Sequence, residues 1–278
     1  MLGKATINGK GAILLGKRVA CDSSDDARPL RVVTHAHYDH LTGLQQSLRR
    51  CEAVIMTAAT RDLLEAIRSR WALRSGNVKT LSYEEPLGYE DEKLTLHFAD
   101  HILGTAQVLV EDAEGTRILY TSDFRLPKTP VIDADLLVIE ATYGNPFQVR
   151  PFKKVVKSAL VSLVNQGLKQ GPVYIFGYHG KIQEVMEILR NARVKAPFIV
   201  PEKVSRISKI CEKHGMKLGK YLLFSGEEAQ SMLSEKDSVV AFCHMNSRRY
   251  KGKDAFRILV SGWEFSSPRR QIGDNEHI

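Results

Sequence analysis

Short apolar runs that end in a polar cluster recur through the first half of the chain. Residues 30–33, 118–120 and 136–139 are such runs, and each is followed closely by side chains that can ligate an ion or carry a proton. Short runs rich in Val, Ile and Leu predict buried strands, and reactive groups at strand ends can converge on one rim. Between the first two runs, apolar positions at helical spacing predict a helix over residues 60–71.

In the second half of the chain the spacing of apolar positions becomes helical, and predicted strands and helices then alternate. Apolar positions at helical spacing predict a helix over residues 151–167, with Pro151 near its first turn and Gly167 at its end. Strands and helices that take turns predict a parallel sheet wrapped by helices, and therefore a second α/β unit of the chain. The expected strands cover residues 173–176, 198–200, 221–224, 238–243 and 257–260, and the expected helices cover 181–192, 202–214 and 227–233.

Composition narrows the class of protein. The chain has 278 residues, of which 43% are hydrophobic and 26% charged, so it can bury a core and is unlike a disordered chain. Its four cysteines have no CxxC spacing, which favours reduced, mostly buried thiols. No apolar run approaches the ~18 residues of a membrane span, and the start lacks a secretory signal. We therefore expect a cytoplasmic protein without a membrane partner.

Charged residues are distributed unevenly between the two halves of the chain. Residues 1–145 carry 17 Lys and Arg against 20 Asp and Glu, whereas residues 146–278 carry 23 against 12. A clustered positive surface attracts polyanions, of which nucleic acid is the usual one. The alternative, a solvated exterior whose lysines serve only solubility, stays open at this point.

The strongest local signal is the run His35-Ala36-His37-Tyr38-Asp39-His40, which follows a predicted strand. Neutral imidazole and carboxylate are preferred ligands of zinc and similar ions, and a spacing of two on an extended segment points His35 and His37 to the same side. His101 and Asp123 lie at or just beyond the ends of other predicted strands. An isolated HxH is more often a surface loop or a helix cap, but this set favours a metal site.

Four segments together resemble the metallo-β-lactamase fold and, more narrowly, the beta-CASP nucleases. The likeness to short prokaryotic RNA 3′-end processing factors and ligase-associated exonucleases is the nearest within that family. The segments are the HxHxDH run, His101-Ile102-Leu103-Gly104-Thr105-Ala106-Gln107, Thr121-Ser122-Asp123-Phe124, and Glu140-Ala141-Thr142-Tyr143-Gly144. The resemblance implies that His35, His37 and His101 hold one zinc ion. It further implies that Asp39 and His40 hold a second ion, that Asp123 bridges the two, and that Glu140 is the accessory acid of the family.

The resemblance also implies a domain plan. It predicts an αββα metallo-β-lactamase sandwich over residues 1–145, an inserted α/β beta-CASP cap over 146–255, and a return to the first domain over 256–278. The family continues into a further histidine-containing segment, whereas this chain ends at Ile278. On that ground we expect the closing elements to be missing, and two alternatives stay open: the sequence is a shortened version, or the protein lacks a complete second metal position. Manganese is an alternative to zinc.

These expectations predict a metal-dependent nuclease that acts on RNA or single-stranded DNA. Asp39 would orient the attacking water, and Glu140 would hold a ligand histidine in its tautomer. Two rival functions stay open, a catalytically weak nucleic-acid-binding relative and a non-nucleolytic hydrolase of the same fold, and self-association of the chain stays open as well. The candidate phosphate contacts are His179, Lys181, Arg248, Arg249, Lys251 and Lys253.

Overall fold

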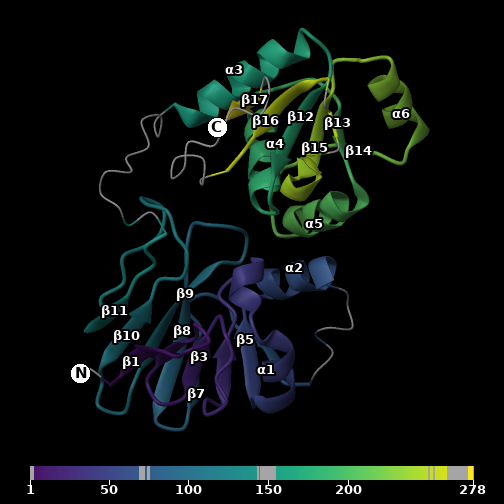
Figure 1. Cartoon of the computed structure of the whole chain (residues 1–278). Helices are drawn as coiled ribbons and strands as arrows, with labels where there is room; N and C mark the ends of the chain where they lie inside the picture. Colours follow the sequence, from purple (N-terminus) through teal and green to yellow (C-terminus); the bar gives the residue numbers. More distant parts are fainter. Residues whose placement is uncertain are drawn as a thin grey trace. The chain divides into compact units, whose positions relative to one another are not determined.

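The chain folds into two compact units, Met1–Thr142 and Tyr143–Ile278 (Figure 1). The computed structural model describes residues 3–68, 73, 76–142, 144, 155–249, 251–252, 254–261 and 275–277. The sequence placed the division between the units at residues 145 and 146, close to the observed one. Because the structure does not fix how the units sit relative to each other, each is described by itself.

The first unit is built on two sheets. The first sheet has the strand order β1-β2-β3-β4-β5-β6, antiparallel from β1 to β3 and parallel from β3 to β6. Its strands are β1 (Ala5–Ile7), β2 (Ile13–Leu15), β3 (Val19–Cys21), β4 (Leu30–Val32), β5 (Ala53–Met56) and β6 (Val78–Thr80).

The second sheet of this unit has the order β11-β10-β9-β8-β7 and is antiparallel except for the parallel pair β10 and β11. Its strands are β7 (Pro86–Tyr89), β8 (Glu92–Phe98), β9 (Ala106–Glu111), β10 (Arg117–Tyr120) and β11 (Leu136–Val138). Val32 and Ile55 of the first sheet share one buried cluster with Leu96 and Val108 of the second. The two sheets therefore pack face to face as a sandwich.

Helices accompany the first sheet at one side (Figure 1). They are α1 (Leu44–Arg50) and α2 (Ala58–Arg68), preceded by a short 3-10 helix, η1 (Tyr38–Leu41). The helix α2 confirms the one expected over residues 60–71, although Trp71 lies outside the described residues. Leu63 and Leu64 of α2 are buried, as the helical spacing indicated.

The second unit is a six-stranded parallel sheet with helices packed against it (Figure 1). The strand order is β14-β13-β15-β12-β16-β17, and this confirms the predicted alternation of strands and helices. The strands are β12 (Val173–Gly177), β13 (Phe198–Val200), β14 (Leu222–Leu223), β15 (Val240–His244), β16 (Phe256–Leu259) and β17 (Asn275–His277). The helices are α3 (Val156–Leu168), α4 (Lys181–Asn191), α5 (Glu202–Lys213) and α6 (Glu227–Ser234).

The end of the chain differs from the expected domain plan. The sequence assigned residues 256–278 to a return into the first domain, but β16 pairs with β12 and β17 pairs with β16, both in the sheet of the second unit. Ile258 is fully buried there, so this strand covers an edge of β12 that would otherwise be open. A short apolar run predicts a strand without specifying which sheet it joins.

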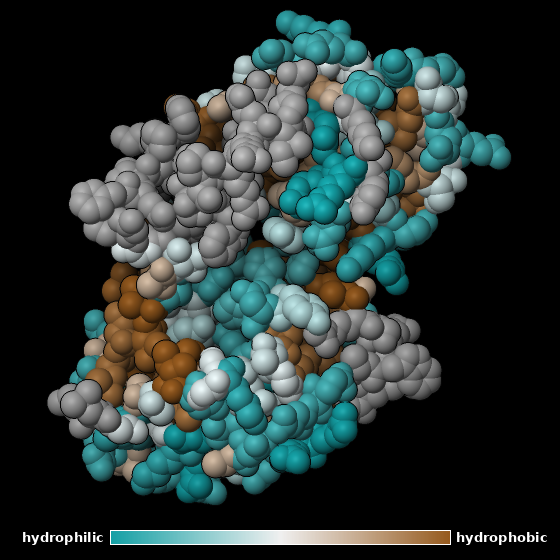
Figure 2. Space-filling model, in the orientation of Figure 1, coloured by the Kyte–Doolittle hydropathy of each residue, from teal (hydrophilic) through white to brown (hydrophobic). Residues whose placement is uncertain are grey.

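The apolar surface of the first unit is concentrated near one sheet edge. Val131, Leu137 and Ile139 are all exposed, and Figure 2 shows hydrophobic surface gathered over β11, the edge strand of the second sheet. Among the residues that the structure describes, no helix combines the length and the apolar character needed to cross a membrane.

Candidate metal centre

The HxHxDH run occupies the carboxyl end of β4 and the turn that follows. His35 is fully buried, whereas His37 is half-buried and Asp39 is mostly exposed at the surface of η1. The Nε2 atom of His35 lies 3.1 Å from the Nδ1 atom of His37. A spacing of two on extended backbone has therefore brought both imidazoles to one place.

His101 and Asp123 reach the same place from the second sheet. His101 lies in the loop between β8 and β9, and its Nε2 atom is 3.0 Å from Nδ1 of His37. Asp123 follows β10, and its Oδ2 atom is 3.4 Å from Nε2 of His101. One donor atom from each of His35, His37, His101 and Asp123 lies within 4.8 Å of the others. Four donors from three strand ends thus share a space the size of one ion site.

A second group of donors adjoins the first through Asp123. The Oδ1 atom of Asp123 lies 3.6 Å from Nε2 of His40, and that nitrogen lies 3.7 Å from Oδ2 of Asp39. The two oxygens of Asp123 therefore point at different donors, one at each group. This is the geometry that lets a single carboxylate serve two neighbouring cations.

Asp22, which the sequence pattern did not single out, holds these donors in place through hydrogen bonds. It directly follows β3 and is 6% exposed. Its carboxylate accepts hydrogen bonds from the backbone N–H and the hydroxyl of Thr34, each at 2.9 Å, and from Tyr120 Oη at 3.1 Å. The Nδ1 atom of His40 donates to it at 2.8 Å. Because a carboxylate only accepts, His40 carries its proton on Nδ1 and presents Nε2 to the donor cluster.

The same chain of hydrogen bonds orients His35. Since the Thr34 hydroxyl gives its proton to Asp22, its oxygen accepts from Nδ1 of His35, 3.1 Å away. Ser122 Oγ donates to Thr34 Oγ1 at 2.7 Å and lies 3.3 Å from the same His35 nitrogen. His35 is therefore protonated on Nδ1, and its Nε2 atom faces the donor cluster.

The charges of the cluster shift two pKa values. Burial lowers the pKa of His40, but the charge and hydrogen bond of Asp22, with Asp123 and Asp39, outweigh it and raise the pKa to about 9. Burial raises the pKa of Asp123 to about 6, against the opposing effect of His40. Several carboxylates and imidazoles are thus held close together, and a divalent ion is the kind of charge that stabilises such a group of donors.

Arg31 ties the ligand turn to the sheet. Its side chain is fully buried in β4, and its guanidinium donates to the carbonyl oxygens of Thr42 (2.8 Å) and His40 (3.2 Å) and to Ser47 Oγ (3.2 Å). A charged residue within an apolar run was the sequence signal that could have revealed it.

The loop that carries His101 is fastened by Gly104. Its carbonyl accepts from Thr57 Oγ1 at 2.8 Å and from Thr60 Oγ1 at 3.0 Å. Its φ is +83°, and a Cβ atom there would come within 2.7 Å of the Thr60 backbone nitrogen. Only glycine fits this close approach to the start of α2.

Glu140 has a different contact from the one expected. Its Oε2 atom accepts from the backbone N–H of Thr142 at 2.8 Å, so it caps the loop after β11. We predicted that Glu140 holds a ligand histidine in its tautomer, but Asp22 does this for His40 and Thr34 does it for His35. Glu140 contributes charge, since it raises the pKa of Asp123.

The candidate phosphate contacts all lie in the second unit. Lys181 is paired with Glu184 at 2.7 Å, Arg248 donates to the carbonyl of Met245, and Lys251 lies over the ring of Phe224. Arg249 is exposed and His179 is half-buried, whereas Lys253 lies outside the described residues. Much of this predicted basic set is therefore engaged within the unit.

Known proteins resemble this chain in sequence and in fold. No family model matches the chain. An uncharacterized protein in the lig 3′ region of Acidianus ambivalens is 41% identical over 138 residues, which are 49% of this chain and 99% of that protein. An RNase J-like protein of Methanocaldococcus jannaschii is 28% identical over 214 residues, 66% of this chain and 49% of the relative. The chain thus spans about half the length of this second relative.

A solved structure of a protein of unknown function from Enterococcus faecalis V583 matches with a TM-score of 0.58 at 15% identity. The match covers 88% of this chain and 66% of that one, and it shows a shared fold. The two-sheet sandwich, with histidines and aspartates gathered at its strand ends, has the layout that the resemblance to the metallo-β-lactamase fold predicted. The chain belongs to the same family as the A. ambivalens protein, and its weaker likeness to the RNase J-like protein agrees with the resemblance to the beta-CASP nucleases.

Proposed function

We propose that the protein is a metal-dependent nuclease that hydrolyses phosphodiester bonds of RNA or single-stranded DNA. The observation that carries this proposal is the position of Asp123, whose two oxygens point at separate donor groups. Enzymes that hydrolyse phosphodiesters commonly use two cations about 3.5–4 Å apart, and a shared carboxylate sets that spacing.

The donors fit zinc or manganese. His35, His37 and His101 would hold one ion, Asp39 and His40 would hold the other, and Asp123 would contact both. Fixed outer nitrogens on His35 and His40 support this fit, since a ligating imidazole needs its second N–H engaged. When bound, such ions lower the pKa of a water molecule and neutralise charge on phosphate oxygens.

The side chains of the cluster have distinct tasks in this proposal. Asp39 has an 80% exposed carboxylate at the open side of the group, so it can accept a hydrogen bond from the attacking water and orient it. Asp22 keeps the proton of His40 on Nδ1, away from the substrate side. Glu140 holds the loop after β11, close enough to Asp123 to influence its charge.

Two observations support nucleic acid as the substrate. The second half of the chain carries 23 Lys and Arg against 12 Asp and Glu, an excess that a small neutral substrate does not require. The relative from M. jannaschii is named RNase J-like. Both weigh against the alternative of a thioester or lactone hydrolase.

The test is cleavage of labelled single-stranded RNA and DNA by the chelated protein, with zinc or manganese added back. We expect added metal to restore cleavage and Asp123→Asn to reduce it by at least about a hundredfold, because both ion positions lose an oxygen ligand. Asp133→Asn, an exposed acid in the same unit, is the matched control and should cleave normally.

Cleavage that survives chelation, or that Asp123→Asn leaves intact, contradicts the proposal. If the protein binds the oligonucleotides in a salt-dependent way but never cleaves them, the chain is instead a nucleic-acid-binding relative without turnover.

A further inference from the structure

A hollow in the surface of the first unit begins at the turn that carries two of the candidate metal ligands. Six residues of η1 and the start of α1 line it, namely Tyr38, Leu41, Thr42, Gly43, Leu44 and Gln45, and its volume is about 330 Å³. Tyr38 stands between His37 and Asp39 in the chain, where consecutive Cα atoms are ~3.8 Å apart. The hollow therefore adjoins the candidate metal centre.

The turn η1 uses its two sides differently. Side chains three residues apart in a 3-10 helix lie one above the other, and Tyr38 and Leu41 both line the hollow. Asp39 and His40 do not line it, and His40 instead faces Asp123, with Nε2 3.6 Å from Oδ1. A ligand group in the hollow can therefore lie beside the donors without displacing them.

The lining of the hollow suits an uncharged, flat ligand. None of its six side chains carries a charge, so a phosphate finds no ionic partner among them. Leu41 and Leu44 are buried, whereas Tyr38 is 75% exposed. A tyrosine as exposed as this contributes little to the core, and its ring can present a face to a ligand that rests on the leucines. These are the properties of a surface that holds an aromatic base.

Gln45 supplies polar groups at the rim of the hollow. Its side chain is exposed, and its carboxamide makes no hydrogen bond to any residue that the structure describes. The neighbouring Gln46 differs, since its amide donates to Asp26 and it does not line the hollow. A carboxamide offers both a donor and an acceptor, which is the pair that the N7 and N6 atoms of adenine require.

The backbone around the hollow is fixed before any ligand binds. The guanidinium of Arg31 donates to the Thr42 carbonyl at 2.8 Å, and Thr42 Oγ1 donates to the Asp39 carbonyl at 3.4 Å. Gly43 has a φ of +69°, and a Cβ atom there would collide with the side chain of Ser24. A site that is formed in advance loses less conformational entropy when it binds a ligand.

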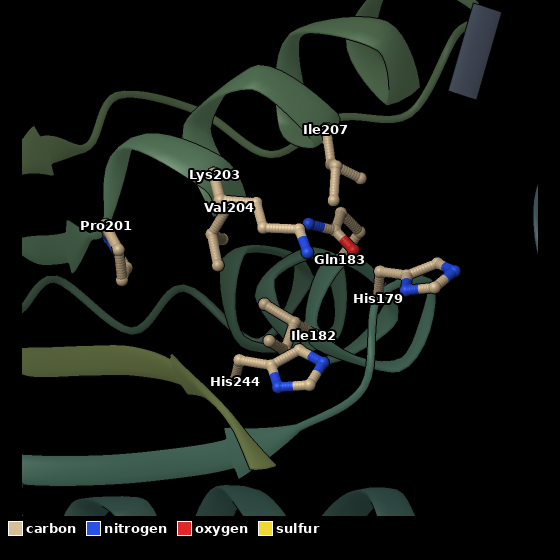
Figure 3. A pocket seen from close by; sticks show the side chains of 8 residues that line it. All are labelled: His179, Ile182, Gln183, Pro201, Lys203, Val204, Ile207 and His244. Carbon is tan, nitrogen blue, oxygen red and sulfur yellow. The ribbon is translucent and has the colours of Figure 1, made fainter. Parts of the chain in front are cut away.

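The pocket of the second unit is of a different kind (Figure 3). It lies at the carboxyl ends of the adjacent parallel strands β12, β13 and β15, and its volume is about 50 Å³. The buried aliphatic side chains of Ile182, Val204 and Ile207 form part of its lining. A flat aromatic ligand therefore fits the larger hollow beside η1 better.

We propose that Tyr38 and Gln45 form a nucleobase-binding subsite for the nucleotide next to the scissile phosphate. The inference deepens the proposed function, on which it rests for the identity of the ligand. The base stacks on the ring of Tyr38, and the carboxamide of Gln45 reads its edge, with adenine as the favoured base.

The first test separates the contribution of the bases from that of the phosphates. Fluorescence anisotropy, with the full chain and a chelator, measures binding of two labelled DNA 12-mers, oligodeoxyadenylate and a strand of abasic residues with the same phosphates. We expect Tyr38→Leu to weaken binding of oligodeoxyadenylate about tenfold and to leave binding of the abasic strand unchanged, because only stacking is lost. The slope of log affinity against log salt should stay the same, since no phosphate contact is removed.

Conservative variants of Tyr38 guard against a purely structural effect. Tyr38→Phe keeps the ring and should bind both strands as the unchanged protein does. Tyr38→Trp enlarges the aromatic face and should bind oligodeoxyadenylate at least as tightly. Melting temperatures show that the variants fold.

The second test concerns the identity of the base. Gln45→Ala should reduce the preference for oligodeoxyadenylate over oligothymidylate about fivefold, because the carboxamide no longer pairs with the edge of adenine. Gln46→Ala is the matched control from the same helix, and it should leave the preference unchanged.

The inference is overturned if Tyr38→Leu weakens binding of both strands equally or of neither, or if the unchanged protein binds neither strand. Because binding is measured without metal, its outcome is independent of cleavage. A chain that binds bases through Tyr38 but does not cleave disproves only the nuclease proposal. A chain that cleaves, and whose binding is indifferent to Tyr38, disproves only the subsite.

Discussion

The candidate metal centre of the first unit and the small pocket of the second unit, lined by His179, Lys203 and His244 among others, lie at similar positions but are supported differently. Both lie at the carboxyl ends of parallel strands, β3 and β4 in the first case and β12, β13 and β15 in the second. Behind the metal centre stands a buried polar network of Asp22, Thr34, Ser122 and Tyr120. Behind the pocket, the support is mainly aliphatic.

The buried polar network behind the first site follows from what a metal centre has to hold. A metal ion needs several donors fixed within a few tenths of an ångström, and such precision requires further hydrogen bonds around them. The side chains that support the pocket of the second unit are mainly aliphatic, among them Ile182, Val204 and Ile207. We therefore expect the first unit to depend on buried polar groups for stability far more than the second does.

The largest expected difference concerns two arginines that each bind several carbonyl groups. Arg31→Met should lower the free energy of unfolding by about 3 kcal/mol, because it removes three hydrogen bonds of a fully buried guanidinium, one of them to the buried Ser47 hydroxyl. Arg190→Met, in the second unit, should cost about 1 kcal/mol, because Arg190 is only half-buried and its acceptors lie nearer to water. Urea unfolding measures both, and equal losses would break the comparison.

A smaller effect is expected where the loop of His101 meets α2. Gly104→Ala should destabilise the protein by about 2 kcal/mol, because of its left-handed backbone and the lack of space beside Thr60. Gly88→Ala is the control, since a Cβ atom there meets no other atom within 4 Å. The difference in thermal midpoint reports the result, and a Gly104→Ala protein as stable as the control would show that the loop can move away from α2.

The smallest of the three effects concerns Asp22. Asp22→Asn should weaken the ion position beside His40 about tenfold, or ~1.4 kcal/mol, because the imidazole loses a charged acceptor on Nδ1. The position of His35, His37 and His101 should lose less affinity, because Asp22 reaches His35 only through Thr34. Metal titration with a count of bound ions measures this, with Asp26→Asn, an exposed acid, as the control. Equal weakening of both positions would mean that Asp22 supports the whole cluster rather than His40.

The donors of the candidate metal cluster could be predicted from the sequence. His35, His37, Asp39 and His40 stand in one run, and His101 and Asp123 follow strands that could be predicted. Asp22 and Arg31 could not be found in the same way. Each is a single residue whose role depends on contacts with side chains far along the chain, and no spacing rule marks such a residue.

The pocket of the second unit could not be predicted from the sequence for a different reason. His179 was a candidate, but Lys203 and His244 join it only because β15 lies between β12 and β13. Local periodicity predicts that a strand exists and leaves the order of strands in the sheet undetermined. The same limit explains why residues 256–259 were assigned to the wrong unit.

Ser122 and its neighbour place a constraint on any attempt to redesign this protein. The backbone at Ser122 is left-handed, with φ +53°, so that this hydroxyl turns toward Thr34 while the carboxylate of Asp123 turns toward the ligands. Orientation of one imidazole and the link between two donor groups are therefore set by a single dipeptide. An engineer who altered either property alone would disturb the other, and selection for a new metal preference should find its useful substitutions elsewhere.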